Sequence, residues 1–360
     1  MDFGLSDEQL QLKQSARELL AAECSTAAVR KAMASEDGTL PELYREIAKL
    51  GWTGLIVPEK FGGAALGMLD MAVLLEEQGY AAMPGPFLFS SAVAAEAIIR
   101  GGSDEAREKW LGGIADGSAI GTVALAEDAG SIAVVAKKGG RLSGRGIFVP
   151  YANLADFIVV AARSEDGQVA MTLVETKAAG VTIRMLKNLD LTRRLAAVDF
   201  DDAAGASLSG GESLYRRLLD VGAVAIAADS LGGMQRALDM AVDYSKVREQ
   251  FGKPIGSFQA LKHAAAEIVA DLEPARSLVW YAAYALDAIP SEASRAAAMA
   301  KARLCEVYSR ATDRAVLMHG GIGFTWEHDI HLWFKRARFN ESYLGSPAYH
   351  RERVAQLGGY

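Results

Sequence analysis

Residues 315–346 read AVLMHGGIGFTWEHDIHLWFKRARFNESYLGS. This stretch joins a glycine-rich turn at 320–323 to an aromatic and basic segment that ends in Tyr343-Leu344-Gly345-Ser346. Glycines let a backbone bend and let a ligand approach without a Cβ in the way. Taken alone, however, such a turn is more typical of a helix C-cap. Other parts of the sequence are therefore needed to distinguish a structural turn from a ligand-binding turn.

Bulk composition indicates an ordinary soluble globular protein. The chain has 360 residues, of which 51% are hydrophobic and 23% charged, enough for two or three domains. Its formal net charge is −7 and the basic residues are dispersed, so a nucleic-acid surface is not expected.

The two cysteines, Cys24 and Cys305, are too few for a disulfide framework and lack metal-ligand spacing. We therefore expect a reducing, cytoplasmic location. The N-terminus MDFGLSDEQ lacks the order of a signal peptide, and apolar runs fall short of the ~20 residues of a membrane span.

Residues 1–117 are predicted to form a helical domain. Ser6 and Gln9 have the spacing of a capping box, which predicts that a helix begins there. Four more helices are expected, separated by turns rich in glycine and proline; they are 41–49, 68–78, 87–100 and 104–114.

Residues 118–206 change to short β-prone runs with a period of two. The expected strands are 121–126, 132–136, 146–149, 157–162, 169–174, 181–185 and 197–200. No helix-length segment separates them, which predicts an antiparallel β-barrel or sandwich.

Residues 207–360 return to helical periodicity. Expected helices are 214–247, 258–288, 291–318, 327–338 and 347–356, and short connections predict antiparallel neighbours in a four-helix-bundle-like domain. The whole chain is thus predicted to be an α+β multidomain protein.

The break between the first two long C-terminal helices carries the most specific pattern. Basic residues there flank a glycine turn at a helix start, a place suited to phosphate. The segment resembles the flavin-binding signature of the acyl-CoA dehydrogenases, with matches at Arg248, Phe251, Gly252, Ile255 and Gln259.

The resemblance spans essentially the whole chain. Residues 51–63 resemble the N-terminal signature of the family, residues 319–324 resemble its glycine-rich turn, and the helical, β, helical order is the acyl-CoA dehydrogenase fold. Membership implies an acyl-CoA substrate, α,β-desaturation, FAD bound between subunits of a tetramer, and electron transfer to an electron-transferring flavoprotein. It also implies that Arg248 and Phe251, with Gln259 nearby, hold the pyrophosphate and adenosine side of the FAD, while Gly320 and Gly321 of a neighbouring chain offer backbone to the same phosphates.

The catalytic base of the family is absent from both of its usual positions. A gapless comparison puts Leu344 where most members carry glutamate, and Gly222 at the second known location. Neither residue can accept a proton. A thioester α-C–H is weakly acidic, so its removal requires a carboxylate within reach.

Other flavin contacts are also altered. Leu317 replaces a glutamine before the glycine turn, the segment 126–131 is shortened, and Phe148-Val149-Pro150 replaces a Trp-Ile-Thr strand. The pattern resembles the subunit that lacks the glutamate in bacterial heterotetrameric acyl-CoA dehydrogenases of steroid catabolism. The leading hypothesis is therefore a subunit that shares its FAD site with a paralogous partner.

Two alternatives stay open. One is a homomeric enzyme with a displaced base, for which Glu341 is the candidate and Asp220 and Asp229 flank the second location. The other is a flavin-free structural subunit, for which the retained Arg248 and Phe251 would serve no purpose. No metal site is expected, because His328 and His331 lack a third ligand nearby.

Overall fold

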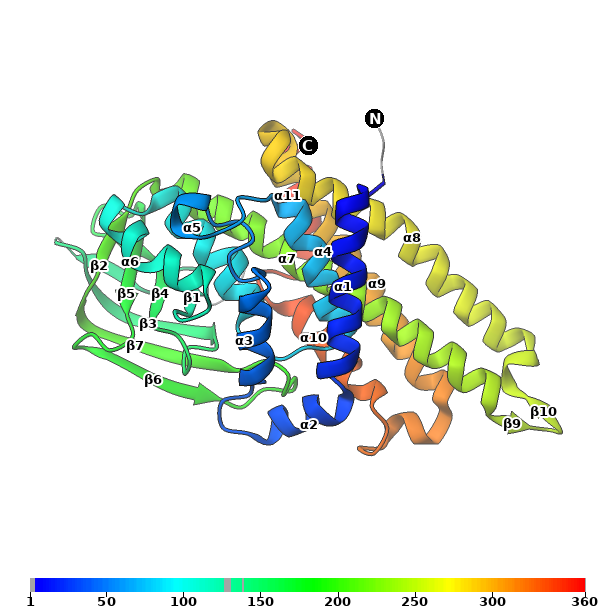
Figure 1. Cartoon of the computed structure of the whole chain (residues 1–360). Coiled ribbons are helices and arrows are strands. Elements are labelled where there is room, and N and C mark those ends of the chain that lie inside the picture. Colours follow the sequence, from blue (N-terminus) through cyan, green and yellow to red (C-terminus); the bar gives the residue numbers. More distant parts are fainter. Residues whose placement is uncertain (1–3, 126–130, 138, 360) are drawn as a thin grey trace.

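The computed structural model describes residues 4–125, 131–137 and 139–359. Figure 1 shows the β-sheet at one side and the long helices α7, α8 and α9 extending to the other, with α1 and α4 packed against the helical bundle. The helical, β, helical order and the fold class expected from the sequence are confirmed.

The N-terminal part is helical. Its elements are α1 (Asp7–Glu23), α2 (Thr26–Ala34), α3 (Pro41–Lys49), η1 (Glu59–Phe61), α4 (Met68–Tyr80), η2 (Leu88–Ala94), α5 (Ala95–Gly101) and α6 (Asp104–Ala115). The predicted capping box is present, since Ser6 Oγ accepts from Gln9 N at 3.2 Å and Gln9 Oε1 accepts from Ser6 N at 3.0 Å. Sequence reasoning missed α2, which is capped by Ser25. The expected helix 87–100 is divided into a π-helical turn, η2, and α5.

Within the described residues, the middle part is one eight-stranded sheet. Its strands are β1 (Gly121–Ala124), β2 (Val135–Lys137), β3 (Arg141–Pro150), β4 (Phe157–Ser164), β5 (Val169–Glu175), β6 (Val181–Leu186), β7 (Leu195–Ala204) and β8 (Ala206–Leu208). Most neighbours are antiparallel, as predicted, whereas β1 and β2 both run parallel to β4. The order β6-β7-β3-β2-β4-β5-β8 leaves β6 and β8 at the ends of the described sheet, so the barrel does not close there.

The C-terminal part consists of α7 (Gly211–Val247), α8 (Gln259–Ala288), α9 (Pro290–His319), α10 (Ile330–Ser342) and α11 (Pro347–Leu357). A hairpin of β9 (Glu249–Gln250) and β10 (Lys253–Pro254), followed by η3 (Ile255–Ser257), joins α7 to α8. The turn η4 (Gly320–Phe324) follows α9. One hydrophobic core runs from the N-terminal helices through the bundle, which fixes the two helical parts against each other.

None of the helices in the described ranges is long and apolar enough to cross a membrane.

Candidate active-site cavity and flavin-contact surfaces

A cavity of about 570 Å³ lies between the sheet and the end of the helical bundle. The sheet and its loops contribute Phe148, residues 188–190 and Leu195 to its wall. The helical side contributes Leu219 of α7, the end of α10, the turn 343–346 and the first turns of α11. Phe148, which stands in the altered Trp-Ile-Thr segment, thus faces this cavity, while residues 126–130 lie outside the described residues.

The two positions that lack the family glutamate lie next to each other, and one of them lines this cavity. Leu344 lines it, and the Leu344 Cδ1 atom lies 2.5 Å from where a Cβ on Gly222 would stand. In its present position, the leucine side chain occupies the space that a Cβ at 222 would need. The structure therefore brings together Leu344 and Gly222, and an apolar contact fills the place of a carboxylate.

The turn that carries Leu344 is held by two buried side chains. Lys301 Nζ donates to the carbonyl oxygens of Asn340 and Gly345 at 2.7 and 3.0 Å. His350 Nε2 lies 2.9 Å from Leu344 O, so Nε2 carries the proton. Burial, with a contribution from Lys301, lowers the pKa of His350 to about 3, which keeps the imidazole neutral at physiological pH. Leu344 itself has a φ of 57°, and the hydrogen bonds from Lys301 and His350 stabilise this left-handed conformation.

The candidate displaced base, Glu341, lies outside the cavity wall. Its carboxylate accepts from Ser309 Oγ at 2.7 Å and pairs with Arg338 at 3.2 Å. Asp220 is likewise engaged, by Arg353 at 2.6 Å and by Ser294. The structure therefore does not bring these carboxylates to the cavity wall.

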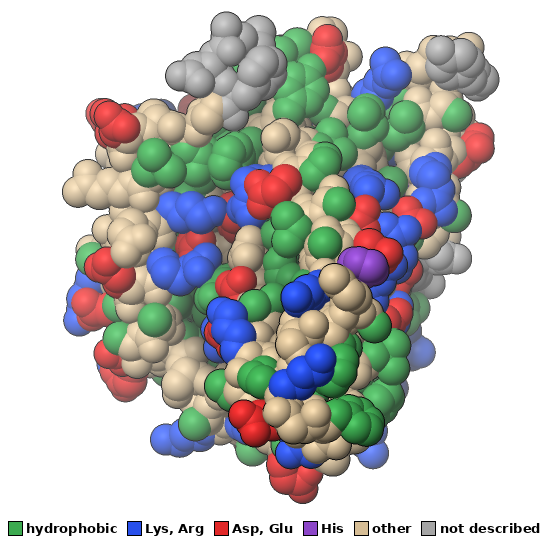
Figure 2. Space-filling view, turned by 90° about the vertical axis from the view of Figure 1, so that its right-hand side faces the viewer, with side chains coloured by type: hydrophobic (Ala, Val, Ile, Leu, Met, Phe, Trp, Pro, Cys, Tyr) green, Lys and Arg blue, Asp and Glu red, His purple; other side chains and the backbone are tan. Residues whose placement is uncertain are grey.

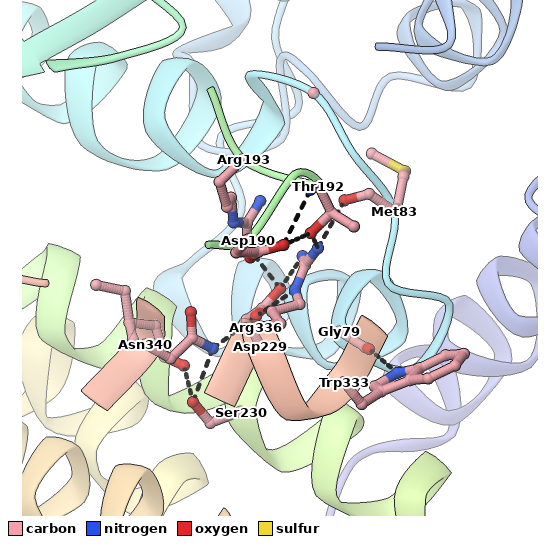
Figure 3. Close-up of polar contacts among 12 residues, drawn as sticks. Gly79, Met83, Asp190, Thr192, Arg193, Asp229, Ser230, Trp333, Arg336 and Asn340 are labelled. Atoms are coloured by element: carbon pink, nitrogen blue, oxygen red, sulfur yellow. Dashed lines mark hydrogen bonds and ion pairs between the residues drawn. The ribbon is translucent and has the colours of Figure 1, made fainter. Parts of the chain in front are cut away.

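Asp229 is the centre of a fully buried polar network (Figure 3). Arg336 makes a two-point contact with it, Arg193 Nη2 donates at 3.0 Å, and Asn340 Nδ2 donates at 2.8 Å. Burial would raise the pKa of Asp229, but the two guanidinium groups and the hydrogen bonds outweigh burial and lower it to about 2. Arg336 also donates to Met83 O, so the network joins α7, α10, the β6–β7 loop and the N-terminal part.

Asp190 is a cavity residue that sequence reasoning missed. It is 2% exposed and lines the cavity, and its Oδ1 accepts from Thr192 N at 2.9 Å and from Thr192 Oγ1 at 2.6 Å. Asp190 Oδ2 has no hydrogen-bond partner within the described chain. The Asp-x-Thr spacing signals this local turn, but nothing in the sequence signals that the turn faces a cavity.

The residues expected to hold FAD phosphates lie on the surface at the far end of α7. Figure 1 shows the β9–β10 hairpin projecting away from the sheet. Arg248 caps α7 and makes no ion pair within the described residues, and Phe251 is 91% exposed. Gln259 begins α8 and is also exposed. Figure 2 views this end of the molecule, where basic and hydrophobic side chains are interspersed.

The glycine turn lies beside the last turns of α7. The rings of His319 and Tyr244 have centroids 4.7 Å apart, which fixes the start of the turn against α7. Gly320 and Gly321 are exposed, and a Cβ on either would meet nothing within 4 Å. Their backbone is therefore open to approach by another molecule.

The histidines near this turn have structural contacts. His328 packs on His319 with ring centroids 4.3 Å apart, and His331 stacks on Trp326 at 4.7 Å. Arg30 pairs with Asp329 at 2.7 Å. These contacts account for the His328 and His331 pair without a metal.

The chain matches two family models, "Acyl-CoA dehydrogenase, N-terminal domain" over residues 6–118 and "Acyl-CoA dehydrogenase, C-terminal domain" over residues 210–358. It is 36% identical to acyl-CoA dehydrogenase IpdE2 of Mycolicibacterium smegmatis, with 98% of each chain covered.

Two solved structures share the fold closely. A variant of the Tcur3481–Tcur3483 steroid acyl-CoA dehydrogenase superposes with a TM-score of 0.92 at 32% identity, covering 98% of each chain. The ChsE4–ChsE5 complex of Mycobacterium tuberculosis gives a TM-score of 0.91 at 28% identity, covering 100% of this chain and 99% of that one. With the helical, β, helical architecture and the full-length match, this chain belongs to the acyl-CoA dehydrogenase family of oxidoreductases.

Proposed function

We propose that this chain is the subunit without a catalytic base in a heterotetrameric, FAD-dependent acyl-CoA dehydrogenase that desaturates an acyl-CoA thioester between its α and β carbons. The observation that carries the proposal is the contact of Leu344 with Gly222, which leaves no carboxylate at either family position. A paralogous subunit would supply the glutamate that removes the α-proton.

The family's FAD-binding residues that this chain retains fit the phosphate end of FAD. Arg248 has an unpaired guanidinium group within the described chain, and Gly320 and Gly321 present an open backbone. Arg248, Phe251, Gln259 and this backbone would bind the pyrophosphate and adenosine by charge, stacking and hydrogen bonds. When bound, FAD supplies the acceptor for the β-hydride, and its electrons would pass to an electron-transferring flavoprotein.

The length of α7 supports an FAD site that is shared between two chains. Gly222 and Arg248 lie 26 positions apart on one continuous helix, which at 1.5 Å per residue separates them by about 39 Å. One dinucleotide does not reach from the cavity to the hairpin of the same chain. Arg248 therefore serves a flavin whose ring lies in the cavity of another subunit.

The acyl group we propose is bulky and ring-bearing. The support is the cavity of about 570 Å³ and the similarity to a protein described as a steroid acyl-CoA dehydrogenase. The free, buried Cys24 and Cys305 fit a reducing compartment such as the cytoplasm.

The test is expression of this chain alone and together with a paralogue that retains the family glutamate. We expect a flavin spectrum and dye reduction by acyl-CoA only from the co-purified pair. Retention of FAD and full turnover by this chain alone would refute the proposal. A stable pair without a flavin spectrum would instead favour a purely structural subunit.

A further inference from the structure

We propose that a second cavity, of about 300 Å³, binds a small monocarboxylate with an apolar body through the guanidinium group of Arg236. This Arg236 cavity lies where α1 and the start of α2 meet α4, α7 and α10. Its wall includes Arg17, Leu20, Cys24, Tyr80, Arg236 and Trp333. Among the described residues, it shares no wall residue with the 570 Å³ cavity, so the inference does not rest on the proposed function.

Arg236 offers free hydrogen-bond donors within the described part of the chain. Its Nη1 atom lies 3.5 Å from Tyr80 Oη, and its side chain makes no other hydrogen bond and no ion pair with the described residues. The residue is only partly exposed, yet its Nε and Nη2 atoms are not sealed from solvent, and Arg236 lines the cavity. Both atoms are therefore accessible to a ligand there.

The guanidinium group is held over two aromatic rings. Its Cζ atom lies 5.3 Å from the centroid of the Tyr80 ring and 5.7 Å from that of the Trp333 ring. Trp333 is fixed because its Nε1 donates to Gly79 O at 3.1 Å (Figure 3). Tyr80 is fixed because its Oη donates to Asp239 Oδ2 at 2.9 Å. The two rings therefore restrain Arg236 before a ligand binds.

The charges around the cavity favour the binding of one anion. Arg17 makes a two-point contact with Glu77 and stacks on the Tyr80 ring, with Cζ 3.4 Å from the ring centroid. The network joined by these ion pairs and by Tyr80 contains four cations, Lys13, Arg17, Arg236 and Arg276, and three carboxylates, Glu76, Glu77 and Asp239. Glu273 also contacts Arg276, but its side chain is 59% exposed, so solvent screens its charge. A ligand with a single negative charge would therefore neutralise the network. A phosphate monoester, which carries nearly two at neutral pH, would leave a negative excess.

The rest of the wall indicates the shape of the ligand. The planar fork of a guanidinium group matches the two oxygens of a carboxylate. Leu20, Ala21 and Ala81 add apolar surface beside the two rings. A volume of about 300 Å³ is at the small end of ligand pockets. The body of the acid is therefore a single ring or a short chain.

The test variant is Arg236→Gln, which removes the positive charge and the guanidinium fork but keeps a polar side chain. Arg236→Lys keeps the charge without the fork. Arg216→Gln is the matched control, because Arg216 lies on the same helix, is 64% exposed and pairs with Glu212. Differential scanning calorimetry of the full chain and of each variant establishes that all of them are folded.

Three probes that share a phenyl ring separate the effect of the charge from that of the apolar body. They are benzoate, benzyl alcohol and phenyl phosphate, and titration calorimetry at neutral pH measures their binding to the purified chain. We expect benzoate to bind at least about tenfold more tightly than either of the others. Arg236→Gln should weaken benzoate binding by about tenfold to hundredfold, because hydrogen bonds between charged groups are strong. Arg236→Lys should be intermediate, and Arg216→Gln should bind benzoate like the parent chain.

Equal binding of the three probes, or benzoate binding that is unchanged in Arg236→Gln, would overturn the inference. Absence of benzoate binding by the parent chain would overturn it too. In that case, loss of the co-purified pair in Arg236→Gln would assign Arg236 to a carboxylate of the partner subunit. The proposed function is tested separately by turnover of the pair that contains the parent chain.

Discussion

Replacing Arg336 with methionine tests whether the buried network holds the parts of the chain together. Arg336 is 0% exposed and contacts Asp229, Thr192 Oγ1 and Met83 O. Methionine preserves much of the apolar stem but leaves Asp229 with Arg193 as its one remaining cationic partner in the described chain. Removing one partner from a buried ion pair costs about 3–5 kcal/mol, because the other charge stays buried and undercompensated.

This cost corresponds to a measurable change in melting temperature. With an unfolding entropy of about 2.1 cal/mol/K per residue, a chain of 360 residues loses roughly 4–7 °C for that free energy. Differential scanning calorimetry of the purified chain measures the shift. Arg336→Lys, which keeps the charge but not the two-point contact, should give an intermediate value.

The matched control is Arg310→Met. Arg310 is 48% exposed and pairs with Asp271, which keeps Arg303 as a partner. A surface pair of this kind contributes about 0–1 kcal/mol, so the control should shift the melting temperature by roughly 1 °C at most. If Arg336→Met shifts it no further than the control, the network does not stabilise the fold as argued.

Four further predictions address the site and the pH dependence. Gly222→Ala should change the free energy of unfolding by less than about 1 kcal/mol, because the higher helix propensity of alanine offsets the shift of the flexible Leu344 tip, and a double-mutant cycle with Leu344→Ala should give a coupling energy of about 0.5 kcal/mol or more; additive changes would contradict the contact. Arg248→Ala should lower the FAD content of the co-purified pair, seen in its absorbance spectrum, and leave the melting temperature of the chain alone unchanged, whereas undiminished FAD would remove Arg248 from the phosphate site. Asp229 has a folded-state pKa of about 2, below its usual 3.8, so it contributes about 2 kcal/mol above pH 4 that is lost as the pH falls toward 2; stability measured over this range should depend less on pH in Asp229→Asn, and an unchanged profile would count against the assignment. Glu341→Gln should leave dye reduction by the pair unchanged, and loss of turnover would revive Glu341 as a base.

The sequence predicted the helices and most strands because their signals are local. The capping box at Ser6, the proline at the start of α3 and the continuous apolar run of β4 each act within a few residues, and their elements begin where expected. The helix α2 was missed although Ser25 caps it, because its apolar stripe is only two turns long. The parallel pairing of β1 and β2 with β4 depends on where the chain crosses the sheet, which no local pattern specifies.

The same contrast between local sequence signals and long-range packing applies to the candidate site. Motif comparison identified Leu344 and Gly222 separately, but their contact requires the packing of a turn near the C-terminus against α7. Asp190 was missed because the cavity wall is assembled from segments more than 100 positions apart in the sequence. A cavity residue without a motif can be found only once these segments are placed in space.

The proposed sharing of each flavin site between two unlike subunits determines how many kinds of site the assembly contains. If each flavin uses the cavity of one subunit and the hairpin of another, two unlike chains create two kinds of site. The first kind of site combines the cavity of the partner, which carries the base, with Arg248 of this chain. The second kind combines the cavity beside Leu344 of this chain with the hairpin of the partner. Loss of the base disables only the second kind, and Arg248 remains necessary for the first.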